Sequence, residues 1–145
     1  MIEQIRAYIE TCPFLNELAE LNQNNSIEQD KNYSINESAD YNPVIYSFLN
    51  GEKEMQFAFH LDTCLSWTDP LQENTNTSLF FEKFRNWLEE NDEQNIYPEV
   101  DDNILPLSIS TTTNEYMVEP NSTEALYRIN GIFTYIKTKG EENNE

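Results

Sequence analysis

The chain has 145 residues and a formal net charge of −19, from eight basic and 27 acidic side chains. This length favours one domain with a core of its own, because such a chain buries about two-thirds of its unfolded surface. A surface this acidic repels DNA phosphates and anionic lipids, so we expect it to bind neither. The sequence contains no run of about 18 apolar residues, so we expect no membrane-spanning helix.

The first ten residues, MIEQIRAYIE, lack the basic start of a signal peptide. We therefore expect a cytosolic protein. Cysteine usage agrees with that compartment, where a disulfide between Cys12 and Cys64 is not expected.

Apolar residues at helical spacing predict a first helix over residues 2–12, with Cys12 in phase with its isoleucines as a small core residue. Pro13 ends this helix, because proline lacks a backbone N–H and disfavours a helical residue before it. Residues 14–22 could form a further helical turn or an extended piece. The Asn-, Gln- and Ser-rich residues 22–32 are typical of a loop.

Strand patterns follow at residues 32–38 (NYSINES) and 42–49 (NPVIYSFL). Asn50–Gly51 is a hairpin turn signal that leads into a third strand, residues 53–62. This third strand alternates strictly, so one face should be buried. The residues of that face are Met55, Phe57, Phe59 and Leu61.

An aromatic stretch, FFEKFRNWLEEND at residues 80–92, predicts an amphipathic helix of about four turns. Residues 64–77 before it are expected to be irregular, and Thr77 or Ser78 to cap its start. The apolar side chains fall within an arc of roughly 120°, which is typical of a core-facing stripe rather than a surface that grips a partner. They are Phe80, Phe81, Phe84, Trp87 and Leu88.

Residues 89–102 carry seven acidic side chains and no basic one, and a loop with Pro98 follows the helix. ILPLSISTT (104–112) is predicted to be a strand with Leu105, Leu107 and Ile109 on one face. Residues 114–123 are expected to form a strand end and a turn. The last predicted strand, residues 125–138, has apolar side chains on both faces, so it should be covered on both sides. These are Tyr127, Ile129, Phe133 and Tyr135 on one face and Ile132 and Ile136 on the other.

The order of helix, strands, helix and strands lacks regular βα alternation and predicts an α+β fold. We expect a mostly antiparallel sheet of about four to six strands, with both amphipathic helices on one face. The aromatic stripe should then meet Phe57, Phe59, Ile109 and Phe133. Residues 1–139 should form the single domain, and 140–145 a disordered acidic tail.

Residue patterns for catalysis are missing. With glycine only at positions 51, 131 and 140, the sequence can contain neither a P-loop nor GxGxxG, and it has no GxSxG. His60 with Cys64 could act as a base and nucleophile, but an isolated strand histidine is more often solvated or hydrogen-bonded. Asp101 and Asp102 could bind a divalent cation, although a solvated acidic loop is the simpler interpretation. We expect no enzyme, no metal and no cofactor.

Several segments, in order and spacing, resemble a family of minor capsid or tail-terminator-like proteins of long-tailed phages and prophages of low-GC Gram-positive bacteria. The similar segments are MIEQIRAYIETCPFL, NYSIN, NPVIYSFLNGEKEMQFAFHL, FFEKFRNWLEEND and LPLSISTTTNEYMVEPNSTEALYRINGIFTYI. They span about residues 1–137. The Asn-rich, acidic loops, such as NQNNSIEQDKN and QENTNT, depart from the family pattern.

The resemblance implies a structural protein that forms a ring, commonly a hexamer, on the end of the tail tube. Its partners would be itself, the tail tube protein and a head-completion or connector protein, with DNA only passing through the lumen. It would reside in the bacterial cytoplasm during assembly and then at the virion head–tail junction. Glu99, Asp101 and Asp102 are candidates for an acidic lumen or surface, where they would not trap phosphates.

Four apolar residues outside the core pattern are candidates for the contact surface: Trp67 and Leu71 in the expected irregular segment, and Tyr116 and Met117 in the late turn. A local mini-core under the loops is the alternative for them. Two other functions stay open: an acidic DNA-mimic inhibitor of the anti-restriction type, and a small-molecule enzyme. Clustering of the acids in loops and tail argues against the first, and the missing motifs argue against the second.

Overall fold

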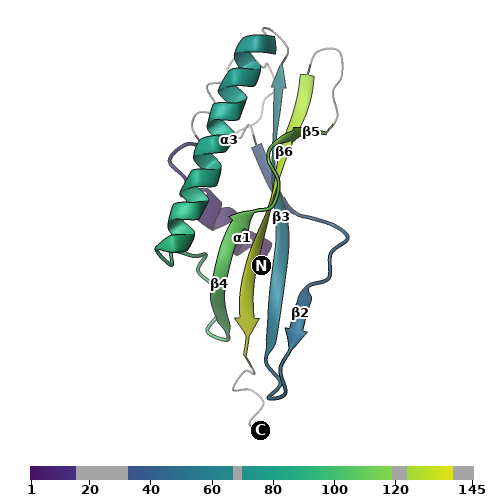
Figure 1. Ribbon diagram of the computed structural model, residues 1–145, viewed down its shortest axis with the longest axis vertical. Coiled ribbons are helices and arrows are strands. Elements are labelled where there is room, and N and C mark those ends of the chain that lie inside the picture. The colour runs from purple at the N-terminus through teal and green to yellow at the C-terminus, as the bar shows by residue number, and fades with distance from the viewer. Residues whose placement is uncertain (16–32, 67–69, 119–123, 139–145) are drawn as a thin grey trace.

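Figure 1 shows a computed structural model of the chain. It describes residues 1–15, 33–66, 70–118 and 124–138, with side chains except at 64–66, 70–77 and 124–125. The elements of these residues are, in order, α1 (Ile2–Ile9), β1 (Tyr33–Glu37), β2 (Val44–Ser47), β3 (Lys53–Ser66), α3 (Pro70–Glu93), β4 (Ile104–Thr111), β5 (Tyr116–Met117) and β6 (Glu124–Lys137).

The strands form one antiparallel sheet of six strands, in the order β1-β3-β6-β4. β2 adds to β3 and β5 adds to β6, so these short strands extend the two edges. The centre is a pair of 14-residue strands, β3 and β6, in register from Lys53–Lys137 to Ser66–Glu124. This antiparallel sheet with helices confirms the predicted α+β fold class.

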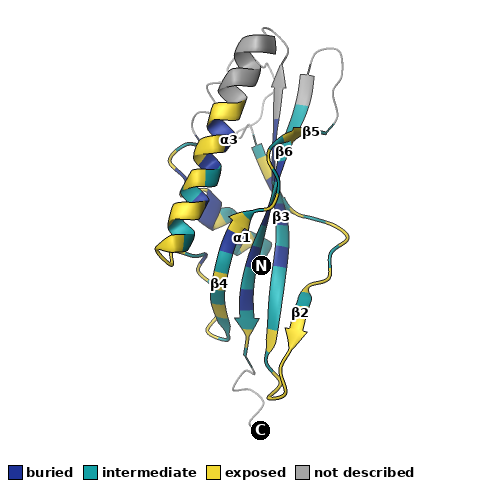
Figure 2. Ribbon diagram, viewed as in Figure 1, coloured by how far each residue is buried: buried dark blue, intermediate teal, exposed yellow. Residues whose placement is uncertain are grey.

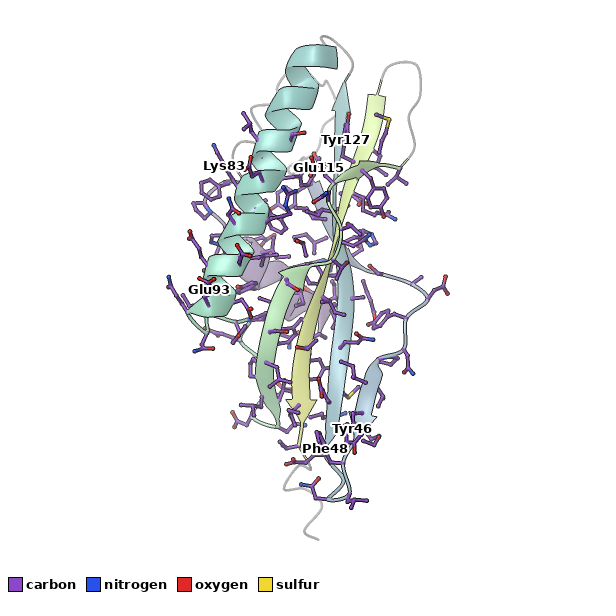
Figure 3. The ribbon with its side chains drawn as sticks, in the orientation of Figure 1. Tyr46, Phe48, Lys83, Glu93, Glu115 and Tyr127 are labelled. Carbon is purple, nitrogen blue, oxygen red and sulfur yellow. The ribbon has the colours of Figure 1, made fainter. Side chains whose placement is uncertain are left out.

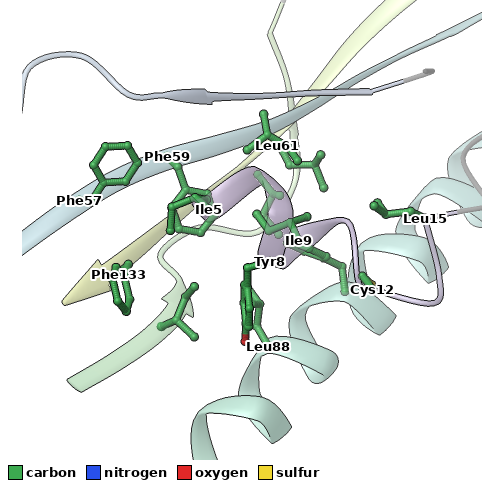
Figure 4. Packing of buried hydrophobic residues seen from close by; sticks show 14 of the residues in the cluster. Ile5, Tyr8, Ile9, Cys12, Leu15, Phe57, Phe59, Leu61, Leu88 and Phe133 are labelled. Carbon is green, nitrogen blue, oxygen red and sulfur yellow. The ribbon is translucent and has the colours of Figure 1, made fainter. Parts of the chain in front are cut away.

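A single cluster of buried side chains joins both helices to the sheet. Ile5 and Ile9 of α1 are fully buried, together with the alternating residues of β3 and β6. Figure 4 shows α1 side chains between these strands and α3. This is consistent with the predicted packing of both helices on one sheet face. The cluster includes the predicted strand residues Phe57, Phe59, Leu61, Ile109, Ile129 and Phe133, and Phe80, Phe81, Phe84 and Leu88 of α3.

The aromatic stripe of α3 is therefore core, as predicted. Phe84 is only 1 % exposed, and its ring stacks on Trp87 at a centroid distance of 6.2 Å. Trp87 is partly buried and lies 5.3 Å from the ring of Tyr8. The indole thus bridges the two helices.

Both helices differ in length from the prediction. α1 ends at Ile9 rather than at residue 12, because the N–H groups of Thr11 and Cys12 bond back only three residues. α3 begins at Pro70, so 70–77 is not irregular and Thr77 and Ser78 do not start the helix. Proline suits a first helical position, and extending a helix costs far less than nucleating one.

The end of α3 follows from Asn95, which adopts a left-handed backbone with φ of 61°. The N–H of Asn95 bonds the carbonyl of Asp92, and the N–H of Ile96 bonds that of Asn91. This pair of bonds is a Schellman C-cap with asparagine in the place of the usual glycine.

The prediction of which face of β4 is buried is wrong. Ile109 is fully buried, but Leu105 and Leu107 are exposed. Pairing to β6 shifts register between Pro106 and Ser108, so a bulge places one extra residue in β4. One inserted residue reverses the alternation of side chains between the two faces.

The prediction that residues 64–77 are irregular is also wrong at its start, since β3 continues to Ser66 by pairing with the start of β6. On the second face of β6, Ile132 and Ile136 are partly buried, so that face is only partly covered.

The expected acidic tail, residues 140–145, lies outside the described residues. No helix in the described ranges is long and apolar enough to cross a membrane.

Candidate interaction surface

The β2–β3 hairpin is closed by a hydrogen-bonded turn. The N–H of Gly51 bonds the carbonyl of Phe48 at 3.1 Å, and the N–H of Phe48 bonds the carbonyl of Glu52 at 2.8 Å. Asn50 Oδ1 accepts from the N–H of Glu52, and Gly51 has a φ of 96°. This is a three-residue hairpin loop with a left-handed glycine, so the Asn50–Gly51 turn prediction is confirmed.

Large apolar side chains project into solvent from this turn and from the strand before it. Leu49 is fully exposed and Tyr46 is 58 % exposed. The rings of Tyr46 and Phe48 meet edge to face at 4.9 Å, so the aromatic pair is held in place (Figure 3). We define the hairpin tip as Ile45, Tyr46, Phe48 and Leu49, all of them exposed.

Figure 2 shows this end of the hairpin exposed and distant from α3. A turn position normally carries glycine, proline, asparagine or a similar polar residue, and Leu49 has no packing reason to be there. Exposed large apolar side chains that cluster on ordered backbone mark contact sites. The hairpin tip is therefore the best candidate for a binding surface among the described residues.

The same end of the sheet has a second exposed apolar side chain on the opposite edge. Cross-strand register places Tyr46, Glu54, Ile136 and Leu105 in one row from β2 to β4. Tyr46 and Leu105 are both exposed at the two ends of this row. The sheet therefore presents different apolar residues at its two edges.

A groove lies between α1 and the loop that follows α3, with a volume of about 610 Å³. We call it the α1 groove. The hydroxyl of Tyr8 donates to the carbonyl of Ile96 at 2.9 Å and thereby joins its two walls. Burial raises the pKa of Tyr8, so this donor stays protonated at neutral pH. The lining residues are Glu3, Gln4, Ala7, Tyr8, Thr11, Ile96, Tyr97 and Glu99.

Tyr97 fastens the loop wall of the groove to the sheet. Its hydroxyl contacts Asp92 Oδ1 at 2.9 Å and the carbonyl of Leu107 at 2.9 Å. Burial, followed by the hydrogen bond to Asp92, raises the pKa of Tyr97 to about 12. Asp92 also accepts from the N–H of Ile109, so polar groups on this edge of β4 are occupied.

Basic side chains are few, and the three arginines lie in ion pairs within the chain. Arg6 pairs with Glu3, Arg85 with Glu115 and Arg128 with Asp62. By contrast, Lys53 and Lys137 lie opposite each other in the β3–β6 register, both exposed and in no ion pair among the described residues. Two lysines outside the ion pairs therefore lie at the end of the sheet next to the hairpin tip.

A polar network surrounds His60, which the sequence presents as isolated. Arg128 holds Asp62 through two hydrogen bonds, of 2.8 and 2.9 Å. His60 Nδ1 lies 3.2 Å from the hydroxyl of Ser38, and Nε2 lies 3.7 Å from Asp62. Burial, opposed in part by Asp62, lowers the pKa of His60.

The grouping of Ser38, His60 and Asp62 has the residue types of a hydrolytic triad but not its geometry. A distance of 3.7 Å is too long for the hydrogen bond that orients a catalytic imidazole. Arg128 already binds both oxygens of Asp62. The pair of Asp62 and Arg128 therefore joins β3 to β6. The Cys64 side chain, which the sequence suggested as a partner of His60, lies outside the described side chains.

Metal binding finds no support in this part of the chain. No group of three or more histidine, cysteine or acidic residues that could hold a metal ion gathers within the described ranges. Cys12 is buried, as predicted for a core cysteine.

The sequence-predicted contact residues have mixed outcomes. Tyr116 and Met117 are exposed in β5, as expected, although the Tyr116 hydroxyl accepts a hydrogen bond from Asn130. Leu71 lies in α3 and not in an irregular segment, and its side chain is not described. Trp67 lies outside the described residues. The acidic candidates Glu99, Asp101 and Asp102 are all exposed.

Sequence reasoning missed the hairpin tip, because it assigned NPVIYSFL as an ordinary strand. The signal was the series of large apolar residues on both faces of a short strand and at the turn itself, where a one-sided strand would alternate with polar residues.

A scan against protein-family models finds no match for this chain, and a search of curated proteins also returns none.

Proposed function

We propose that this chain is a structural protein of the head–tail junction of a long-tailed phage or prophage, acting as a tail terminator. It would cap the tail tube as a ring and offer a surface to a head-completion protein. The observation that carries this proposal is the hairpin tip, with four exposed apolar side chains on and before a hydrogen-bonded turn. Assembly contacts need such preformed apolar surface.

The sheet edges also support assembly into a ring. Tyr46 and Leu105 provide different apolar residues at opposite edges of one row. Two different surfaces on one chain pair head to tail, and such contacts close into rings when the rotation allows it.

The charge suits a channel for DNA. Asp101 and Asp102 are exposed before β4. Carboxylates that line a lumen would repel passing phosphates and keep DNA from binding. In this role His60 has no catalytic part, and the chain needs no cofactor.

The test is to delete the gene from its phage and to image the particles by electron microscopy. We expect heads without attached tails beside tails of abnormal length, and recovery when the gene is supplied in trans. Normal, infectious virions would overturn the proposal and favour an acidic DNA-mimic inhibitor instead.

A further inference from the structure

We propose that copies of this chain associate head to tail, with the hairpin tip of one copy seated in the α1 groove of the next. The inference rests on the proposed ring-forming function and names its contact. Two unlike surfaces of the same molecule carry it. One is an apolar projection and the other is a partly apolar groove.

The projecting partner is already in its binding conformation. Three hydrogen bonds close the turn that bears Leu49, and the contact between Tyr46 and Phe48 holds the aromatic side chains. A rigid apolar projection loses little conformational entropy on binding, so more of its burial contributes to affinity.

The receiving partner is also fixed. Tyr8 joins α1 to Ile96, and Tyr97 joins the loop to Leu107, so both walls are hydrogen-bonded to their neighbours. Ile96 is exposed and Ala7 is small and exposed, which leaves apolar surface for an incoming side chain. A volume of about 610 Å³ can accept side chains of the hairpin tip.

Charge complementarity favours a second copy as the occupant. Glu3 and Glu99 line the α1 groove. Lys53 and Lys137 lie beside the hairpin tip and are in no ion pair among the described residues. Docking would bring these lysines toward the carboxylates of the next copy.

The two surfaces lie at separate places in the fold, the hairpin tip at the end of the sheet distant from α3 (Figure 1). One copy can therefore use its tip and its groove at once, with two different neighbours. This is the condition for a head-to-tail ring rather than a closed symmetric dimer.

The test compares variants of the full chain by analytical ultracentrifugation at a salt concentration where the wild type associates. Leu49→Glu alters the tip, and Ala7→Arg fills the groove. Each should lower the association constant about tenfold to a hundredfold, the value of burying one large apolar side chain. Leu79→Glu is the matched control, because Leu79 is an exposed leucine of α3 and gains the same charge. It should associate as the wild type does.

The decisive experiment mixes the two variants in equal amounts. The Leu49→Glu variant keeps its groove and the Ala7→Arg variant keeps its tip, so the mixture should form a dimer of one copy of each and nothing larger. Circular dichroism spectra equal to that of the wild type would show that the variants are folded.

Three results would overturn the inference. They are no association of the wild type at any salt concentration, association of the Leu49→Glu variant as strong as that of the wild type, or no dimer in the mixture. A tip that instead binds the tail tube protein would give the second result. Particle morphology after gene deletion tests the proposed function separately. A normal deletion phenotype with intact head-to-tail pairing would overturn the function alone.

Discussion

The ring of Phe59 lies against the Cα of Gly131, its direct neighbour in the β3–β6 register. A Cβ built on Gly131 would lie 2.6 Å from Phe59 Cζ and 3.1 Å from the carbonyl oxygen of Ser110. Phe59 is only 1 % exposed, so its ring has no space into which it can move. The glycine of the central strand is thus required by close packing and not by its backbone angles.

We therefore expect Gly131→Ala to destabilise the fold by about 1–3 kcal/mol, as overpacking of a core does. Urea denaturation followed by fluorescence measures this free energy of unfolding. Ser110→Ala, an exposed change on the adjacent strand β4, is the control and should stay within about 0.5 kcal/mol of the wild type. Equal stability of Gly131→Ala and the wild type would contradict the packing described.

Removing the ring of Phe84 should destabilise the fold by about 3–5 kcal/mol, because the side chain is 1 % exposed and leaves a cavity. Chemical denaturation of Phe84→Ala gives the value. Leu79→Ala on the same helix should cost far less, since Leu79 is 49 % exposed. A loss below about 1 kcal/mol for Phe84→Ala would mean that α3 does not cover the sheet as described.

Breaking the pair between Asp62 and Arg128 should also be costly. Asp62 is 7 % exposed, and Asp62→Asn would leave the guanidinium without its carboxylate. We expect the free energy of unfolding to fall by about 3 kcal/mol. This is the lower end of the range for breaking a buried ion pair, because Arg128 is partly exposed. Glu3→Gln, which breaks the exposed pair with Arg6, should cost at most about 1 kcal/mol. Similar losses for both variants would show that the Asp62 pair is not a buried one.

Stability should fall in mild acid because of His60. Its pKa in the folded protein is lowered by burial, so between that pKa and about 6.5 the unfolded chain binds more protons. The free energy of unfolding should therefore decrease as pH falls from about 6.5 toward the folded pKa. His60→Asn keeps a polar partner for Ser38 and should flatten this part of the profile. Urea midpoints measured between pH 7.5 and 5, above most carboxylate titration, test it. If the free energy of unfolding changes with pH in the same way in the wild type and in His60→Asn, a group other than His60 causes the change.

Self-association should increase with ionic strength. Each copy carries a formal charge of −19, so copies repel one another, and screening acts over about 10 Å at 0.1 M salt and about 3 Å at 1 M. Sedimentation velocity across this salt range should show larger species at higher salt. Dissociation on adding salt would mean that attraction between charges, and not apolar contact, holds the copies together.

Sequence patterns alone determined the α+β class, the alternating face of β3 and the aromatic stripe of α3. These follow from local periodicity, because a residue's face in a regular strand or helix depends only on its neighbours in the chain. The Asn50–Gly51 turn was equally predictable, since the left-handed backbone that glycine adopts freely is a local requirement.

Tertiary structure decided what periodicity could not. The bulge that turns Leu105 and Leu107 outward depends on how β4 pairs with β6, which is a long-range contact. His60 lies beside Ser38 of another segment and beside Asp62, which Arg128 of β6 binds, and the sheet alone brings these residues together. The hairpin tip became a candidate surface for the same reason: whether an apolar side chain is buried depends on what the rest of the fold places against it, and nothing in the described structure covers Leu49.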